Sequence, residues 1–368
     1  MARIVQFGTS RFLQAHVDLF VHQARASGQD VGPITVVKTT EGAERSGRVV
    51  AFRNPAGFPV CIRGYLDGEV IDETVQVTSV DSAFATASDW PEIARLFAED
   101  DVAAVVTNVG ERGYEVATAD QHMPTRSPAI SFPAKLLQLL HVRHQTGGSP
   151  PLILPCELVP SNGAALRRQL VSLSLRWNLS PAFAEWFTEG VVFADTLVDR
   201  IVSAPLEPLG AIAEPYALWA IRHAEPPLRH AAILSVPDLE PFERLKLHVL
   251  NLGHTVLADL WLNRGGLAGE TVKQLLSRDD VRRELLSIYE DEVMPGFAAR
   301  GMVEDAKRYV GNTVPRFDNP FLEHHLSDIA QNHVIKVQRR IADFIAWAKG
   351  ADSGLEMPRL AAIASATR

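Results

Sequence analysis

The sequence predicts an α/β protein: a doubly wound parallel sheet with an inserted antiparallel hairpin, followed by an all-helical C-terminal domain. Two observations carry this prediction. The chain opens with the order strand, turn, helix, strand over residues 3–7, 12–26 and 34–37, which is the start of a parallel sheet. From about Pro205 onward, strand-like runs become rare and apolar residues recur at helical spacing. We therefore expect two domains, residues 1–203 and 204–368.

The composition is that of an ordinary globular protein and narrows the possible functions. Of 368 residues, 46% are hydrophobic, and the net charge of −8 without a basic run disfavours nucleic-acid binding. The chain begins directly with a strand and no apolar run reaches about 18 residues, so neither a signal peptide nor a membrane span is expected. Cys61 and Cys156 are typical of thiols in a reducing cytoplasm, and no Cys/His grouping has zinc-ligand spacing. We expect a cytoplasmic protein that uses no metal.

The turn after the first strand is the expected phosphate-binding loop of a Rossmann-like domain. It consists of Gly8, Thr9, Ser10, Arg11 and Phe12. The helix that follows would offer free N–H groups to a pyrophosphate. Ser10 stands where the pattern Gly-x-Gly-x-x-Gly has its second glycine, so an ordinary strand-to-helix turn explains these residues alone equally well.

The ends of two further strands face the same crevice in such a fold. The second strand ends at Lys38 without the carboxylate that binds an NAD ribose, and Lys38 could instead pair with a 2′-phosphate or lie in solvent. On these residues alone, the choice between NAD and NADP stays open. The strand at 102–107 leads into Asn108 and Glu111, which are candidates for the same cofactor crevice, although Glu111 alone fits a solvated loop acid equally well.

Other elements are placed by turn and helix signals. A hairpin within residues 49–79, with an Asp67-Gly68 turn, is expected beside the parallel sheet as an inserted edge. Asn162 lies where a strand at 152–154 gives way to a helix, at the same crevice or in a plain Asn-Gly turn. The expected helices of the second domain are residues 216–223, 242–262, 272–276, 280–292, 297–309 and 322–347.

The most informative stretch is residues 245–262, which is long, apolar and free of proline. On an α-helix of about 100° per residue, His254 lies about 80° and Asn251 about 140° from Lys246, so the three share one arc. Gly253, inside the helix, suggests that another backbone or a ligand approaches closely. Burial would lower the pKa of a lysine and make it a usable base. The alternative is a lysine that reaches solvent beside a core histidine.

The spacing Lys246-x₄-Asn251-x₂-His254 resembles the catalytic signature of the mannitol dehydrogenase family, which are zinc-independent polyol dehydrogenases and hexuronate reductases. The resemblance covers about residues 3–341 and implies that Lys246 is the general acid/base, that Asn251 and Asn162 hold the reacting oxygen, and that His254 contacts substrate. It further implies substrate contacts for the other matching polar residues, which are Asp199, Arg200, Arg316 and His324. Asp199-Arg200 could equally be a structural ion pair, and Arg316 a surface residue at a capping turn.

The resemblance implies an NAD(P)-dependent oxidoreductase that interconverts a sugar alcohol and its ketose. Local matches around Phe132, Cys156 and Asp199 resemble the hexuronate reductase branch (tagaturonate/altronate or fructuronate/mannonate), which is the alternative. Members of the family are usually longer at the C-terminus, and this departure favours a polyol slightly. A non-catalytic nucleotide-binding sensor is disfavoured because Lys246, Asn251 and His254 are all present. The partner is a small molecule, and the sequence leaves the oligomeric state open.

Overall fold

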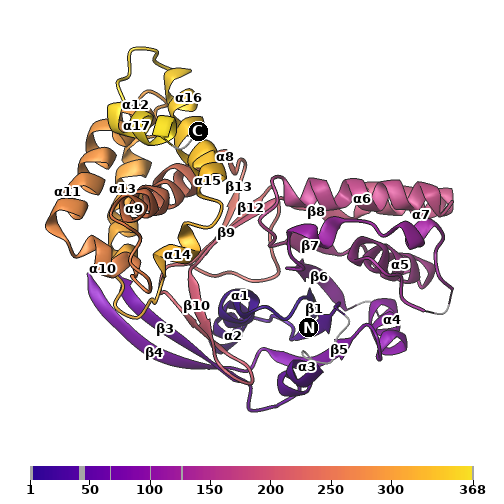
Figure 1. Cartoon of the computed structure of the whole chain (residues 1–368). Helices are drawn as coiled ribbons and strands as arrows, with labels where there is room; N and C mark the ends of the chain where they lie inside the picture. The colour runs from indigo at the N-terminus through magenta and orange to yellow at the C-terminus, as the bar shows by residue number, and fades with distance from the viewer. Residues whose placement is uncertain (1–2, 41–45, 67, 100, 126, 367–368) are drawn as a thin grey trace. The chain divides into compact units, whose positions relative to one another are not determined.

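The structure, a computed structural model, describes residues 3–40, 46–66, 68–99, 101–125 and 127–366 (Figure 1). The chain forms two compact units. The first comprises Met1–Ile62 and Glu73–Leu239, and the second comprises Arg63–Asp72 and Glu240–Arg368. The units therefore divide between Leu239 and Glu240, and the boundary expected after residue 203 falls inside the first unit. No helix in the described part of the chain is long and apolar enough to cross a bilayer.

The first unit is built on a six-stranded sheet in the order β5-β2-β1-β6-β7-β8, in which every pair is parallel. Its strands are β1 (Arg3–Phe7), β2 (Ile34–Lys38), β5 (Val80–Ala85), β6 (Val102–Thr107), β7 (Leu152–Pro155) and β8 (Val192–Phe193). The prediction of a doubly wound parallel sheet is confirmed. Strands β1, β2, β6 and β7 were expected, because their apolar residues form the short continuous runs of strands buried on both faces.

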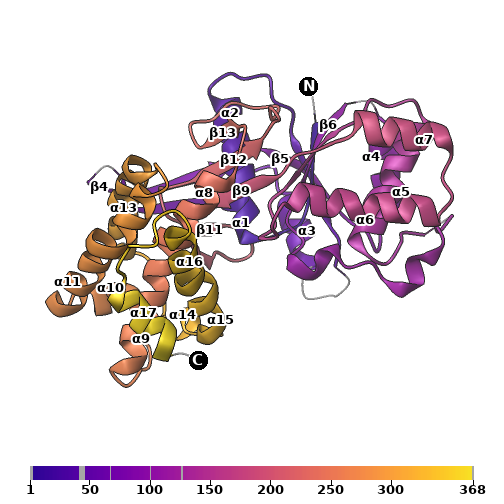
Figure 2. The same ribbon diagram turned by 90° about the horizontal axis from the view of Figure 1, so that it is seen from above.

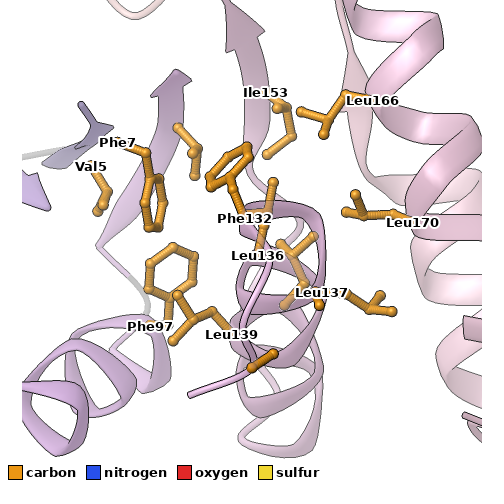
Figure 3. Close-up of a cluster of buried hydrophobic side chains, with 14 of the residues drawn as sticks. Val5, Phe7, Phe97, Phe132, Leu136, Leu137, Leu139, Ile153, Leu166 and Leu170 are labelled. Carbon is orange, nitrogen blue, oxygen red and sulfur yellow. The ribbon is translucent and has the colours of Figure 1, made fainter. Parts of the chain in front are cut away.

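Helices surround the sheet, and they contribute to a large buried apolar cluster. They are α1 (Arg11–Leu13), η1 (Gln14–Asp18), α2 (Leu19–Ala26), α3 (Ser46–Phe52), α4 (Trp90–Ala98), η3 (Glu111–Tyr114), η4 (Thr118–Gln121), α5 (Phe132–Gln145), α6 (Asn162–Arg176), α7 (Pro181–Glu185) and η5 (Trp186–Gly190). Figure 3 shows Phe97, Phe132 and Leu170, from α4, α5 and α6, converging beside Phe7 of β1 and Ile153 of β7. This core holds the carboxyl ends of the central strands at fixed positions.

Two smaller sheets correct the expected topology. The hairpin β3 (Phe58–Leu66) and β4 (Glu69–Val77) does not extend the parallel sheet; it joins β10 (Val202–Pro205) and β11 (Ala211–Ala213) in the order β10-β11-β3-β4. Residues 49–52 belong to helix α3 instead, and Asp67 lies outside the described residues. The helix expected at 216–223 is strand β12 (Leu218–Arg222), between β9 (Thr196–Asp199) and β13 (Ile233–Val236). Leu218 to Ile221 are all buried, and such a run has no period that separates strand from helix.

Within the second unit, the described residues from 240 onward form helices joined by loops, as predicted. Its helices are α8 (Glu240–Leu245), η6 (Lys246–Asn251), α9 (Leu252–Asn263), α10 (Val272–Leu276), α11 (Asp279–Ile288), η7 (Tyr289–Val293), α12 (Met294–Ala298), α13 (Val303–Phe317), α14 (Leu326–Ile329), α15 (His333–Val337), η8 (Gln338–Ala342), α16 (Asp343–Lys349) and α17 (Pro358–Ala366). Helix α9 packs against α10, α14 and α15 (Figure 2). The long helix expected at 322–347 is interrupted before α15, where Asn332 has a φ of 55°.

Two fully buried histidines predict that the protein loses stability in acid. Burial lowers the pKa of His16 to about 3 and that of His248 to about 4, from an ordinary value of 6.5. The unfolded chain therefore takes up protons below about pH 6.5 that the folded chain refuses. The stability that follows is fully present above about pH 6.5 and is lost as the pH falls toward 4. A tenfold difference in proton affinity between the two states corresponds to about 1.4 kcal/mol.

Urea unfolding followed from pH 7.5 to pH 4.5 measures this effect. The free energy of unfolding is expected to fall with pH, and to fall less steeply in His16→Gln, which cannot titrate. His122→Gln is the control, because His122 is exposed. An identical pH slope in the wild type and His16→Gln would contradict the assignment.

Candidate functional site

A cavity of about 330 Å³ lies at the carboxyl ends of β1, β2 and β6 in the first unit. It is lined by Gly8, Thr9, Ser10, Arg11, Lys38, Thr39, Thr40, Arg48, Asn108, Val109 and Pro205. Six of the residues expected at the cofactor therefore surround one space. Phe12 does not line the cavity; its ring stacks on His16 with centroids 4.7 Å apart. Glu111 begins the 3₁₀-helix η3, and its side chain lies outside the described part.

The loop after β1 is tied to the loop after β6. Gly8 has a φ of +126°, and a Cβ there would lie 2.6 Å from the carbonyl oxygen of Asn108, so only glycine fits. The Ser10 hydroxyl accepts from the N–H of Leu13 at 3.3 Å and donates to Oδ1 of Asn108 at 3.1 Å. Asn108 in turn donates to the carbonyl of Cys156 at 2.9 Å. Ser10, at the second glycine position, thus caps the helix and joins the two loops.

The donors around this cavity fit the phosphates of a dinucleotide. The helical run that starts at Arg11 presents its N-terminus to the cavity, and Arg11, Lys38 and Arg48 supply positive charge. Arg48 also donates to the carbonyl of Thr9 at 3.5 Å, which keeps its guanidinium beside the loop. Among the described lining residues there is no carboxylate. Arg48 was not anticipated, because it is distant in sequence from the phosphate-loop pattern.

Glu157 is a second residue that the sequence pattern did not point to. It is 4% exposed and follows strand β7 closely. Its carboxylate accepts hydrogen bonds from the Thr107 hydroxyl at 2.8 Å, the N–H of Val109 at 2.9 Å and the Tyr114 hydroxyl at 2.9 Å. Burial raises the pKa of Glu157 in spite of these donors. The residue fixes the loop between β6 and η3, and an acid just after a buried strand was the available signal.

Asn162 is held by backbone groups. It is 1% exposed, and its amide nitrogen donates to the carbonyls of Pro155, Glu157 and Thr196 at 3.0–3.2 Å. Its oxygen accepts from the N–H groups of Gly163 and Thr196, both at 2.9 Å. These bonds order the turn between β7 and α6. A contact between Asn162 and a substrate oxygen stays a prediction, and it would require one of these bonds to be given up.

Arg200 is likewise engaged within the first unit. Its guanidinium donates to the carbonyl of Ala15 at 2.6 Å and to that of Glu214 at 2.8 and 3.0 Å, and burial lowers its pKa to about 10. Asp199 is buried as the last residue of β9. Arg200 therefore joins the helical run of residues 11–26 to the small sheets, and substrate binding by Asp199 and Arg200 stays a prediction.

In the second unit, α8, η6 and α9 form one helical run whose middle section is a π-helix, Lys246–Asn251. The N–H of Leu252 donates to the carbonyl of Leu247, five residues earlier. This corrects the expected uniform α-helix. Residues five apart lie one turn apart in a π-helix, so Lys246 and Asn251 share a face, whereas α-helical spacing would separate them by about 140°. Lys246 and Asn251 are both half-buried.

His254 lies one turn further along, in an apolar and cationic setting. It is 6% exposed, and its ring centroid lies 4.5 Å from that of Phe317 and 4.8 Å from that of His324. Within the described structure its Nε2 is buried without a hydrogen-bond partner. Burial lowers the pKa of His254 well below its ordinary value. Repulsion that a protonated His254 would meet from His324, Arg316, Arg340 and Lys336 adds to the effect. The ring is therefore neutral at pH 7.

The structure thus places His324, from the segment before α14, against His254 of α9, and Arg316 of α13 is near enough to lower the pKa of His254. It adds two cations that were missed, Lys336 and Arg340. Lys336 donates to the carbonyl of Ile329 at 2.7 Å, and Arg340 is half-buried in η8. They lie four residues apart in the helical stretch, and that spacing was the only signal. We refer to Arg316, Lys336 and Arg340 as the cationic cluster.

Comparisons with known proteins point to one family. The sequence profile of the mannitol dehydrogenase Rossmann domain matches residues 2–230, and that of the mannitol dehydrogenase C-terminal domain matches residues 238–368. The chain belongs to the mannitol dehydrogenase family. The motif at Lys246, Asn251 and His254 therefore lies in the C-terminal domain of this family, and the cavity beside Gly8 in its Rossmann domain. Members of the family are dehydrogenases that act on polyols or sugar acids.

Among curated relatives within the family, the altronate oxidoreductase of Bacillus subtilis is 27% identical over 365 residues, which are 92% of this chain and 73% of that protein. The altronate oxidoreductase of Cronobacter sakazakii is 29% identical over 387 residues, covering 97% and 77%. Two solved structures share the fold. A D-sorbitol dehydrogenase has a TM-score of 0.77 at 19% identity and covers 93% of this chain and 75% of its own. The Pseudomonas fluorescens mannitol 2-dehydrogenase, in a complex with NAD and D-mannitol, has a TM-score of 0.71 at 17% identity and covers 99% and 83%.

The position of Arg48 predicts a role in holding the dinucleotide. Arg48→Ala is expected to raise the KM for the dinucleotide about tenfold with little change in kcat, because a charged hydrogen bond contributes about 1.5–3 kcal/mol. Initial rates at varied dinucleotide concentration measure it. Arg95→Ala, an exposed arginine of α4 in the same unit, is the control. An unchanged KM in Arg48→Ala would remove Arg48 from the cofactor site.

Proposed function

We propose that this protein interconverts a secondary alcohol and a ketone on an open-chain sugar acid, as an altronate-type oxidoreductase that uses NAD. The observation that carries the proposal is the buried, unpartnered Nε2 of His254 beside the cationic cluster. This arrangement offers both a hydrogen-bonding group for a hydroxyl and positive charge for a carboxylate. The curated relatives named altronate oxidoreductases support the same substrate class.

Lys246 is the proposed general base when the alcohol is oxidised. Uncharged Lys246 accepts the hydroxyl proton on Nζ, and charged Lys246 returns a proton to the oxygen in the reverse direction. When bound, the nicotinamide takes up or supplies the hydride. Asn251 shares the face of Lys246 and donates to the same oxygen as it gains negative charge, a contribution on the order of 3 kcal/mol for one such donor. His254, kept neutral by burial, holds a neighbouring hydroxyl through Nε2.

The charge around His254 favours a sugar acid over a polyol. Three cations that are buried or half-buried carry a desolvation cost, which a bound carboxylate offsets and a neutral hydroxyl offsets less. Arg316 is 5% exposed, and its planar guanidinium can hold two carboxylate oxygens at once. A polyol such as a hexitol is the second candidate, and the expected roles of Lys246 and Asn251 would be the same for it.

The proposal names NAD as the cofactor, and the same cavity would also accept the phosphates of NADP. NAD is named in the complex of the P. fluorescens enzyme, and the glycine turn and cations of the cavity fit the phosphates of either dinucleotide. A panel of aldonates and polyols assayed with NAD and with NADP, followed by the absorbance of the reduced nicotinamide, tests substrate and cofactor together. A polyol with the highest kcat/KM would overturn the sugar-acid assignment.

Replacement of Lys246 tests the acid/base role. Lys246→Ala is expected to bind the dinucleotide normally and to lose at least about a hundredfold in kcat, because no other group then moves the proton. Lys307→Ala, an exposed lysine of α13, is the control. Addition of EDTA to the wild type is expected to leave kcat unchanged. Near-normal turnover in Lys246→Ala, or a loss on chelation that zinc restores, would contradict this mechanism.

Replacement of Arg316 tests the substrate class. Arg316→Leu is expected to raise the KM for an aldonate at least tenfold and that for a polyol less, because hydrogen bonds to charged groups contribute about 1.5–3 kcal/mol and neutral ones about 1. Arg308→Leu, on the same helix and exposed, is the control. If an aldonate is the best substrate and Arg316→Leu leaves its kcat/KM unchanged, Arg316 is not in the site.

A further inference from the structure

We propose that Tyr289 and Thr255, the latter together with Arg340, are positioning residues that hold the π-helix of Lys246–Asn251 and so keep Lys246 and Asn251 on one face. The proposal rests on the function proposed above for those two residues. A π-helix is rare and less favourable than the α-helix on either side of it, so contacts beyond its own backbone hydrogen bonds must stabilise it. Such contacts are present on its carbonyls.

The first contact comes from Tyr289, the residue that begins η7. Its hydroxyl donates to the carbonyl of Val249, inside the π-helix, at 2.9 Å. Tyr289 is 2% exposed, and burial raises the pKa of its hydroxyl far above the ordinary value, so it remains a donor throughout the working range of pH.

Gly253 makes this contact possible. A Cβ at Gly253 would lie 2.0 Å from the Tyr289 hydroxyl and 3.0 Å from the ring of Phe317. The sequence suggested that a backbone or a ligand approaches this glycine. The group that approaches is the side chain of Tyr289, and this position lets its hydroxyl donate to the carbonyl of Val249.

The second contact is made by Thr255 and Arg340. The Thr255 hydroxyl donates to the carbonyl of Asn251, the last residue of the π-helix, at 2.8 Å. Arg340, within η8, donates to the Thr255 hydroxyl at 3.1 Å and to the same carbonyl at 3.4 Å. Thr255 is fully buried, so its hydroxyl is held beside this carbonyl by the surrounding packing.

The geometry gives a specific consequence for loss of either contact. If the segment returned to α-helical spacing, the helix on one side would turn by about 100°, the angle of one residue, relative to the other. Lys246 would then no longer face the same oxygen as Asn251. Proton transfer would slow, whereas the dinucleotide site, in the first unit, would keep its affinity.

Two substitutions and a matched control test this inference. Tyr289→Phe removes one contact, and Thr255→Val removes the other. Thr313→Val is the control, because the Thr313 hydroxyl donates to the carbonyl of Tyr309 at 2.7 Å, four residues earlier, in the ordinary α-helix α13. Thr255 and Thr313 are both fully buried, so the two valine variants lose the same bond from a hydroxyl to a carbonyl, and Thr255→Val also loses the bond from Arg340.

Tyr289→Phe and Thr255→Val are expected to lower kcat at least tenfold, because Lys246 is misplaced, and to leave the KM for the dinucleotide unchanged. The pH at which kcat changes on the alkaline side of its pH profile is expected to shift for the same reason. Thr313→Val is expected to lower the Tm by a similar amount and to keep wild-type kcat. Equal kcat in all three variants would overturn the inference. Arg340 is left intact, because it also belongs to the cationic cluster.

The comparison among these variants separates loss of stability, failure of the proposed function and failure of the positioning role. If Tyr289→Phe proves too unstable to assay, Thr255→Val against Thr313→Val decides alone, because both retain the packing volume of threonine. If Lys246→Ala keeps its turnover, the proposed function fails whatever these variants do. If Lys246→Ala is inactive while Tyr289→Phe and Thr255→Val match the control, only the positioning role fails.

Discussion

One hydrogen bond, from the N–H of Leu252 to the carbonyl of Leu247, sets the geometry on which the proposed chemistry depends. It adds a residue to one helical turn and thereby aligns Lys246 with Asn251. The surrounding unit is built to keep that turn. Because Gly253 has no side chain, the hydroxyl of Tyr289 can reach the segment. Tyr289, the first residue of η7, and Arg340, in the middle of η8, donate the hydrogen bonds that come from other helices.

Burial acts on charge in the same region in two ways. It keeps the His254 ring neutral, so the ring adds no repulsion to the cationic cluster and stays available as a hydrogen-bonding group. It also removes water from Arg316, which strengthens the interaction of its guanidinium with a bound anion. A neutral polar group beside concentrated positive charge is suited to a molecule that carries hydroxyls at one end and a carboxylate at the other.

The sequence predicted the elements whose pattern is local. Strands β1, β2, β6 and β7 stand out as short apolar runs, and Lys246, Asn251 and His254 carry a recognisable spacing. Features that depend on distant segments were missed. Strand β12 shows no alternation of apolar and polar residues because both of its faces are buried. A π-helix cannot be told from an α-helix by its apolar pattern. Gly253 indicates that some group approaches closely, but the sequence does not show that this group is Tyr289. Arg340 and Glu157 act only through folding partners far along the chain.

The link from Ser10 through Asn108 to the carbonyl of Cys156 has a thermodynamic consequence for the nucleotide cavity. Loops that follow three strands of the sheet, β1, β6 and β7, are joined before any ligand arrives, and the Glu157 carboxylate restrains the second of them further. The entropy of ordering these loops is therefore spent during folding. More of the interaction energy with the dinucleotide then appears as affinity, because little of it is consumed in rearranging the protein.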